Sequence, residues 1–169
     1  ISFNGKSLAS ATSTDIAVTS VASPLYTFVS QGDLYVTQDS TPVSTRQLLG
    51  GALSEPVLRL QMRAENEPID VTNIILHSSG STAGSVERLE LYADNAATPF
   101  ASATVGACAA ADKLTHNPNS GNNNVAAFCA SMGSQQLVVP EGEDLDIIIR
   151  ARLKTDAAGA TSNQELGFF

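Results

Sequence analysis

The fold of this chain is decided by residues 144–154, which read D-L-D-I-I-I-R-A-R-L-K. Apolar and polar residues alternate along this stretch, and only Ile148 interrupts the polar series. Side chains of a β-strand point alternately to opposite faces, so the pattern predicts a long strand with one face in a core and the other in water. Such a strand builds a sheet, and it carries no catalytic arrangement of residues.

Shorter segments with the same alternation follow one another along the chain, separated by turn-forming residues. Residues 57–64 alternate cleanly, and residues 69–77 change parity near Thr72, which predicts a bulge. Without an amphipathic helix pattern, these segments predict an all-β fold of about nine strands, an antiparallel β-sandwich of immunoglobulin-like or jelly-roll-like type. A closed barrel is the alternative. The other predicted strands are residues 25–29, 33–37, 86–93, 100–105, 125–129, 135–139 and 164–169.

The charge of the chain and its hydropathy each argue against one class of partner. Its 169 residues carry 17 acidic and nine basic side chains, for a formal net charge of −8. A nucleic-acid-binding surface needs clustered basic residues, so we expect no nucleic-acid partner. No apolar run approaches the ~20 residues of a membrane-spanning helix, so we expect no membrane insertion. The length suits one well-buried domain.

Two cysteines, Cys108 and Cys129, bracket a segment that contains the turn-forming run N-P-N-S-G-N-N-N at residues 117–124. We predict a disulfide between them, because the segment has no other anchor; the bond would stabilise the fold by about 3 kcal/mol. A disulfide also implies an oxidising compartment. The alternative is a pair of free, buried thiols. A zinc site is not expected, since His116 is the only further ligand nearby.

Residues 1–23 are rich in Ser, Thr and Ala and have few apolar anchors. We therefore divide the chain into an N-terminal extension, residues 1–23, and a sandwich domain, residues 24–169. The extension has two interpretations. It is an edge strand and loop of the same domain, or it is a donor strand that pairs with the sheet of a neighbouring copy. The apolar residues that would enter the neighbour are Phe3, Leu8, Ile16 and Val18.

Three segments in a fixed order resemble the immunoglobulin-like β-sandwich domains of bacterial and archaeal surface or filament proteins. They are V-L-R-L-Q-M-R-A-E-N-E-P-I-D-V-T-N-I at 57–74, V-E-R-L-E-L-Y-A at 86–93 and L-V-V-P-E-G-E-D-L-D-I-I-I-R-A-R-L at 137–153. The resemblance covers residues 33–154 and implies the fold and an extracellular or cell-surface location. The N-terminal segment and the cysteine-bracketed insertion depart from the pattern, and an assembly role would reside there.

The sequence offers no catalytic site, and we expect no enzyme. The only histidines are His77 and His116, and no G-x-S-x-G motif is present. No cofactor is expected. The densest acidic cluster offers weak calcium ligands, although its spacing does not match an EF-hand loop; the alternative is a solvated turn. Its members are Glu141, Glu143, Asp144 and Asp146.

These observations predict a structural subunit of an extracellular polymer, such as a filament, pilus or surface layer, with copies of the same chain as partners. The alternative is an adhesin or carbohydrate-binding module, for which the candidate contacts are Tyr26, Tyr35, Tyr92 and the loop 117–124. A viral capsid or decoration protein is a third interpretation, because β-sandwiches serve there too.

Overall fold

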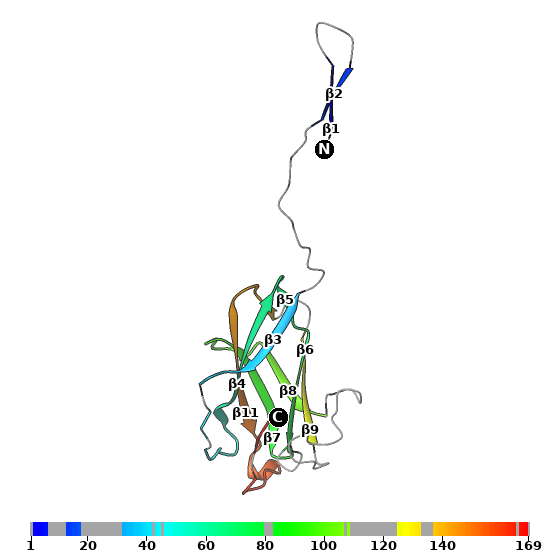
Figure 1. Ribbon diagram of the computed structural model, residues 1–169. Helices are drawn as coiled ribbons and strands as arrows, with labels where there is room; N and C mark the ends of the chain where they lie inside the picture. The colour runs from blue at the N-terminus through cyan, green and yellow to red at the C-terminus, as the bar shows by residue number, and fades with distance from the viewer. Residues whose placement is uncertain are drawn as a thin grey trace. The chain divides into compact units, whose positions relative to one another are not determined.

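The computed structural model describes residues 2–6, 13–17, 32–41, 43–44, 46–79, 83–106, 108, 125–132, 137–164 and 166–168. The chain divides into two compact units, Ile1–Ser30 and Gln31–Phe169. In the first unit, strands β1 (Ser2–Lys6) and β2 (Ser13–Ala17) pair antiparallel, drawn in blue in Figure 1. The predicted boundary at residue 23 and the predicted strand at 25–29 lie outside the described residues.

The second unit contains the predicted antiparallel β-fold, which is confirmed. Its described part holds nine strands (Figure 1). Seven of them form one sheet in the order β3-β4-β11-β7-β8-β9-β6, and β10 pairs with β5. The strands are β3 (Asp33–Gln38), β4 (Leu53–Glu65), β5 (Ile69–Asp70), β6 (Asn73–Ser79), β7 (Val86–Ala93), β8 (Ala101–Val105), β9 (Val125–Ser131), β10 (Val138–Val139) and β11 (Asp144–Leu153).

The seven-stranded sheet folds back on itself at β8. The first half of β8 pairs with β7, from Leu89↔Ala103 to Leu91↔Ala101. Its second half pairs with β9, where Val105 lies opposite Phe128. One strand therefore belongs to both halves of the sheet, and the halves pack face to face as a sandwich-like, half-open barrel.

The core lies between these two halves. β11 runs between β4 and β7, with Ile147 opposite Leu60 on one side and Ala93 on the other. Ile147 and Ile149 are fully buried, as the alternation of residues 144–154 predicts. The other half contributes Phe128, which is also fully buried. The remaining large core side chains are Met62, Val71, Ile74, Leu76, Val86, Leu89, Leu91, Met132, Leu137 and Val139.

The parity change near Thr72 corresponds to a break between β5 and β6. Val71 donates its backbone N–H to Leu137 at 2.9 Å, and the carbonyl of Thr72 accepts from Met132 at 2.9 Å. The chain therefore leaves the β5–β10 pair and enters the β6–β9 pair within two residues. Of the predicted terminal strand at 164–169, the described residues show one bridge, between Phe168 and Ser78.

Candidate functional site

Strand β3 is exposed along its whole length, although it pairs with a strand that helps form the core. Leu34 and Val36 lie opposite Ala64 and Met62 of β4, so they share the face of the sheet that looks into the core. Their exposed fractions are 37% and 50%, whereas Ala64 and Met62 have 0% and 4%. The apolar side chains of β4 are thus buried in the core, whereas those of the neighbouring β3 are exposed.

The outer backbone edge of β3 is also open. Among the described residues, β3 pairs with β4 alone. The backbone N–H of Asp39 donates to the carbonyl of Arg59 at 3.1 Å, which fixes the phase of the antiparallel ladder. Because bonded residues alternate, the odd-numbered residues of β3 face β4 and the N–H groups of Leu34, Val36 and Gln38 point outward. An edge of this kind is a template for a further strand.

A groove of about 250 Å³ opens beside this edge. Its wall includes Gln38 of β3 and His77 of β6, which are the two edge strands of the seven-stranded sheet. The sheet therefore curls until its two edges border one groove, which is lined by Gln38, Leu58, Leu60, Ile75, Leu76, His77 and Phe168. Leu58 and Leu60 pack against the core but stay partly exposed at the floor.

The C-terminal segment fills one part of this groove. Phe168 bridges to Ser78 of β6, and its ring meets the ring of buried Phe128 edge-on, with centroids 6.5 Å apart. Leu166 and Phe168 are partly buried against the core. The segment therefore covers β6 at Ser78, while the apolar side chains of β3 remain exposed.

The N-terminal unit presents two of the four predicted donor residues within its described part. In the β1–β2 hairpin, Phe3 and Ile16 are directly opposite each other in register. Leu8 and Val18 lie outside the described residues. A two-stranded hairpin is marginally stable on its own, because it has no second layer to cover an apolar pair.

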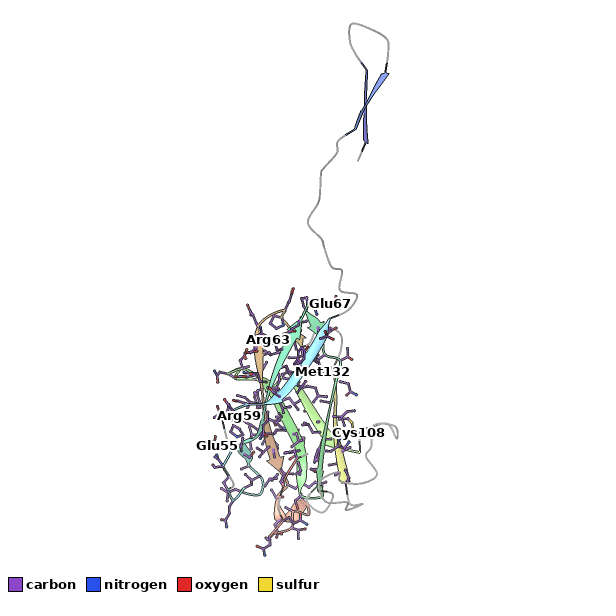
Figure 2. The ribbon with its side chains drawn as sticks, viewed as in Figure 1. Glu55, Arg59, Arg63, Glu67, Cys108 and Met132 are labelled. Carbon is purple, nitrogen blue, oxygen red and sulfur yellow. A yellow bond between two sulfur atoms is a disulfide. The ribbon has the colours of Figure 1, made fainter. Side chains whose placement is uncertain are left out.

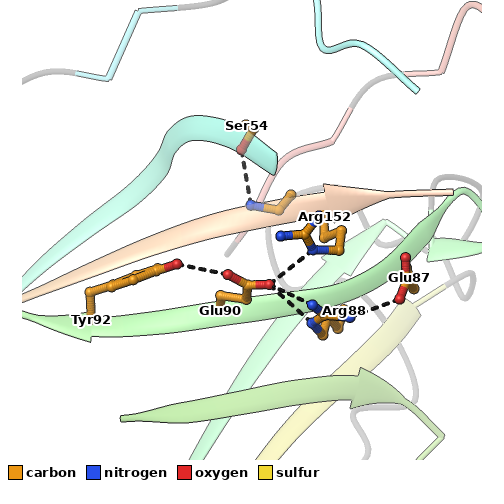
Figure 3. Close-up of polar contacts among 7 residues, drawn as sticks. Ser54, Glu87, Arg88, Glu90, Tyr92 and Arg152 are labelled. Atoms are coloured by element: carbon orange, nitrogen blue, oxygen red, sulfur yellow. Dashed lines mark hydrogen bonds and ion pairs between the residues drawn. The ribbon is translucent and has the colours of Figure 1, made fainter. Parts of the chain in front are cut away.

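A charged cluster lies on the outer face of β7 and β11 (Figure 3). Glu90 accepts hydrogen bonds from Tyr92 Oη at 2.7 Å and from the Nε atoms of Arg88 and Arg152, each at 3.0 Å. The guanidinium of Arg150 stacks over the ring of Tyr92, 5.4 Å from its centroid. These contacts explain how a carboxylate that is 5% exposed is tolerated on the outer face of a sheet.

The surroundings of Glu90 shift two pKa values. Burial raises the pKa of Glu90, but the hydrogen bonds from Tyr92, Arg152 and Arg88 outweigh it and leave the pKa below its ordinary 4.5. Burial also raises the pKa of Tyr92 above its ordinary 10.0, and the Glu90 carboxylate raises it further. Sequence alternation places these residues on the polar face of their strands, but it gives no sign that Glu90 is buried.

The predicted disulfide between Cys108 and Cys129 is confirmed, with Cα atoms 5.2 Å apart. It covers the outer face of β9, where Cys108 and Cys129 pack with Ala127 and Ile75. Figure 2 labels Cys108 at the side of the sandwich next to β9. The loop 117–124 that it closes lies outside the described residues, as does His116. A disulfide is consistent with a location outside the cytoplasm.

The four weak calcium candidates lie around the turn that leads into β11. Asp144 pairs with Arg63 at 3.2 Å, and Asp146 accepts from the Gln61 amide at 3.3 Å. Glu141 and Glu143 are exposed. Within the described residues, no group of three or more His, Cys, Asp or Glu side chains is arranged to hold a metal ion.

The tyrosines that were candidate ligand contacts are not brought together by the described part of the structure. Tyr35 is half exposed on β3, whereas Tyr92 is buried and bonded to Glu90, and Tyr26 lies outside the described residues. A second groove of about 230 Å³ is lined by Thr41, Val43, Arg46, Glu55, Pro56 and Arg59. No described helix is long and apolar enough to cross a membrane.

Compared with protein-family models, curated proteins and solved structures, the chain shows no match. The resemblance to immunoglobulin-like surface domains stays an expectation from the sequence. The uncovered strand β3 and the groove beside it are therefore the features on which a function is argued.

Proposed function

We propose that this chain is a structural subunit of an extracellular polymer, a filament, pilus or surface layer, whose copies assemble by β-strand addition. The observation that carries the proposal concerns β3, which pairs with β4 alone among the described residues and exposes its apolar residues Leu34 and Val36. Unpaired edges of this kind invite intermolecular pairing, so soluble monomers normally cover or charge them. On β3 the apolar residues Leu34 and Val36 are exposed, so this edge strand is neither covered nor charged at these two positions.

Three further features support this assignment. The hairpin β1–β2 is a compact unit separate from the sandwich and carries the apolar pair Phe3 and Ile16. The disulfide between Cys108 and Cys129 suits an extracellular setting. The groove of about 250 Å³ is lined by residues of both edge strands, Gln38 of β3 and His77 of β6, so it lies where an extended peptide added to the sheet would run.

The test is to delete residues 1–20 and to compare negative-stain images and sedimentation profiles of the variant with those of the full chain. The full chain is expected to form polymers, and the deletion variant is expected to remain monomeric. A full-length control, Phe3→Asp/Ile16→Asp, keeps the segment but removes its apolar pair and should also fail to polymerise. Polymers of unchanged length from the deletion variant would refute the proposal.

A further inference from the structure

We infer that the acceptor site for assembly is the outer edge of β3 with its adjoining groove, and that its occupant is strand β2 of a second copy, docked head to tail. This inference rests on the proposed function, because it assumes that copies join by strand addition. It adds which edge accepts the strand, which strand is donated and in which direction.

The backbone of β3 supplies the acceptor groups. The N–H groups of Leu34, Val36 and Gln38 point away from β4, so they are placed to bond an added strand without disturbing the β3–β4 ladder. The other edge strand, β6, already bridges to Phe168 at Ser78. Among the described residues, the open edge of the sheet is therefore β3, and a strand added there would lie beside the groove.

The exposed side chains of β3 can accept the apolar residue of β2. Leu34 and Val36 are both exposed on the groove side of β3, with Tyr35 between them. In β2, Ile16 is the one large apolar residue, and it lies between Asp15 and Ala17. An added strand in this phase would place Ile16 beside Leu34 and Val36, at the groove.

The hairpin can dock without being opened. β2 pairs with β1 along one edge, and no other described strand pairs with β2. β1 is the poorer donor, because Gly5 lies inside it and glycine weakens a strand. β2 has five residues and β3 has six, so the two strands match in length.

The direction of docking follows from the distribution of charge along the sandwich. At the end where β4 stops and β11 starts, the described residues include nine carboxylates and a single base, Arg63. The carboxylates are Asp33, Glu65, Glu67, Asp70, Asp94, Glu141, Glu143, Asp144 and Asp146. The opposite end carries Arg46, Arg152 and Lys154 beside fewer acids.

Two acidic ends that face each other would repel strongly, whereas an acidic end against an arginine-bearing end would not. β3 begins at Asp33, opposite Glu65, so the first strand of the sandwich starts at the acidic end. A donated β2 that ran antiparallel to β3 would bring two acidic ends together. A β2 that runs parallel to β3 brings the acidic end of one copy to the opposite end of the next, and such a head-to-tail contact gives an open chain of copies.

The test substitutes one residue of β3 in the full chain in two ways. Val36→Pro removes the outward N–H and leaves the β3–β4 bonds in place, because position 36 faces away from β4. Val36→Ala keeps the N–H and serves as the matched control. We expect Val36→Pro to raise the concentration for half-maximal assembly about tenfold or more, and Val36→Ala to raise it about threefold or less. Analytical ultracentrifugation measures the concentration.

A second variant, Leu34→Lys/Val36→Lys, covers the case in which proline disturbs the fold. Both positions are already exposed, so lysines there leave the core intact and block the edge. If both edge variants assemble like the parent chain, the acceptor is not β3, even though polymerisation itself stands. If the parent chain is monomeric at all concentrations, the proposed function fails as well.

Two further outcomes would overturn the inference. Amide hydrogen exchange on residues 33–38 is expected to slow as the protein concentration rises. Slow exchange at the lowest concentration would mean that the chain's own N-terminal segment occupies the edge. Mass photometry is expected to show a ladder of oligomers; a closed dimer and nothing larger would mean that the acidic ends face each other and that the direction is wrong.

Discussion

The guanidinium Nε–H of Arg152 on β11 donates to Oε1 of Glu90 on β7 at 3.0 Å, and this contact ties the two central strands together on their outer face. Glu90 also accepts from Arg88 and Tyr92, so three side chains from two strands bond to one carboxylate. The carboxylate side chain is 6% exposed and its arginine partners about one-third exposed. The cluster is therefore a structural tie and not a solvated ion pair.

Replacing Glu90 by glutamine is expected to lower the free energy of unfolding by about 2 kcal/mol at neutral pH, because two arginines lose their buried anionic partner. The pKa of Glu90 is lower in the folded state, so this contribution is present above pH 4.5 and is lost as the pH falls through the folded pKa. Urea unfolding of Glu90→Gln and the parent chain from pH 7 to pH 3 should show the difference shrinking.

The control is Glu87→Gln, because Glu87 pairs with the same arginine at 2.8 Å but is 48% exposed. Its expected cost is below about 1 kcal/mol. Equal losses for Glu87→Gln and Glu90→Gln would show that burial of the carboxylate does not govern the strength of the cluster.

Replacing Tyr92 by phenylalanine is expected to cost about 1 kcal/mol at neutral pH, since the hydroxyl donates to Glu90 at 2.7 Å. The pKa of Tyr92 is raised in the folded state, so the contribution of its neutral hydroxyl is present below pH 10.0 and is lost as the pH rises through the folded pKa. Thermal unfolding should show the difference in stability between Tyr92→Phe and the parent chain shrinking as the pH rises above 10. In a Glu90→Gln background the cost of Tyr92→Phe should nearly vanish; an undiminished cost would contradict the coupling.

Removal of the disulfide by Cys108→Ser/Cys129→Ser is expected to lower the free energy of unfolding by about 3 kcal/mol, because a loop spanned by 21 residues is released in the unfolded chain. Guanidinium unfolding with and without a reducing agent measures the effect. The reductant should lower the parent to the level of the double variant and leave the variant unchanged. A parent protein that is insensitive to complete reduction would contradict the prediction.

Replacing Phe168 by alanine is expected to cost about 1–2 kcal/mol, since its ring is only partly buried and meets Phe128 at the side of the groove. Phe128→Ala, at a position with 0% exposure, should cost about 4 kcal/mol. Urea unfolding of both variants gives the comparison. A larger loss from Phe168→Ala than from Phe128→Ala would show that the C-terminal segment is part of the core and not a cover over its edge.

Much of the fold is predictable from local pattern. Residues 57–64 alternate cleanly and residues 144–154 alternate apart from Ile148, and both form strands whose apolar faces look into the core. A period of two is a property of the backbone itself, so it survives any arrangement of the sheets. The cysteine pairing was also predictable, because the chain has only two cysteines and the loop between them has no other anchor in the sequence.

The candidate site was predictable only in part. The alternation of Leu34, Tyr35 and Val36 looks like that of any half-buried strand, and it does not say whether the opposite layer reaches it. Glu90 alternates with Leu89 and Leu91 as a surface residue would, yet three neighbouring side chains bury it. In both cases the outcome depends on contacts with other strands, such as that of Arg152 on β11 with Glu90 on β7, which a local pattern does not contain.

The sequence by itself determined which segments become strands and which face of each strand is apolar, because these follow from backbone geometry and side-chain hydrophobicity. The tertiary structure decided which apolar faces are covered. The order β3-β4-β11-β7-β8-β9-β6 curls the sheet until β3 and β6 border one groove, and it leaves Leu34 and Val36 of β3 exposed while Met62 and Ala64 of β4 are buried. Whether an apolar strand face is buried depends on the strands that pack opposite it, and those strands are set by pairing between distant parts of the chain.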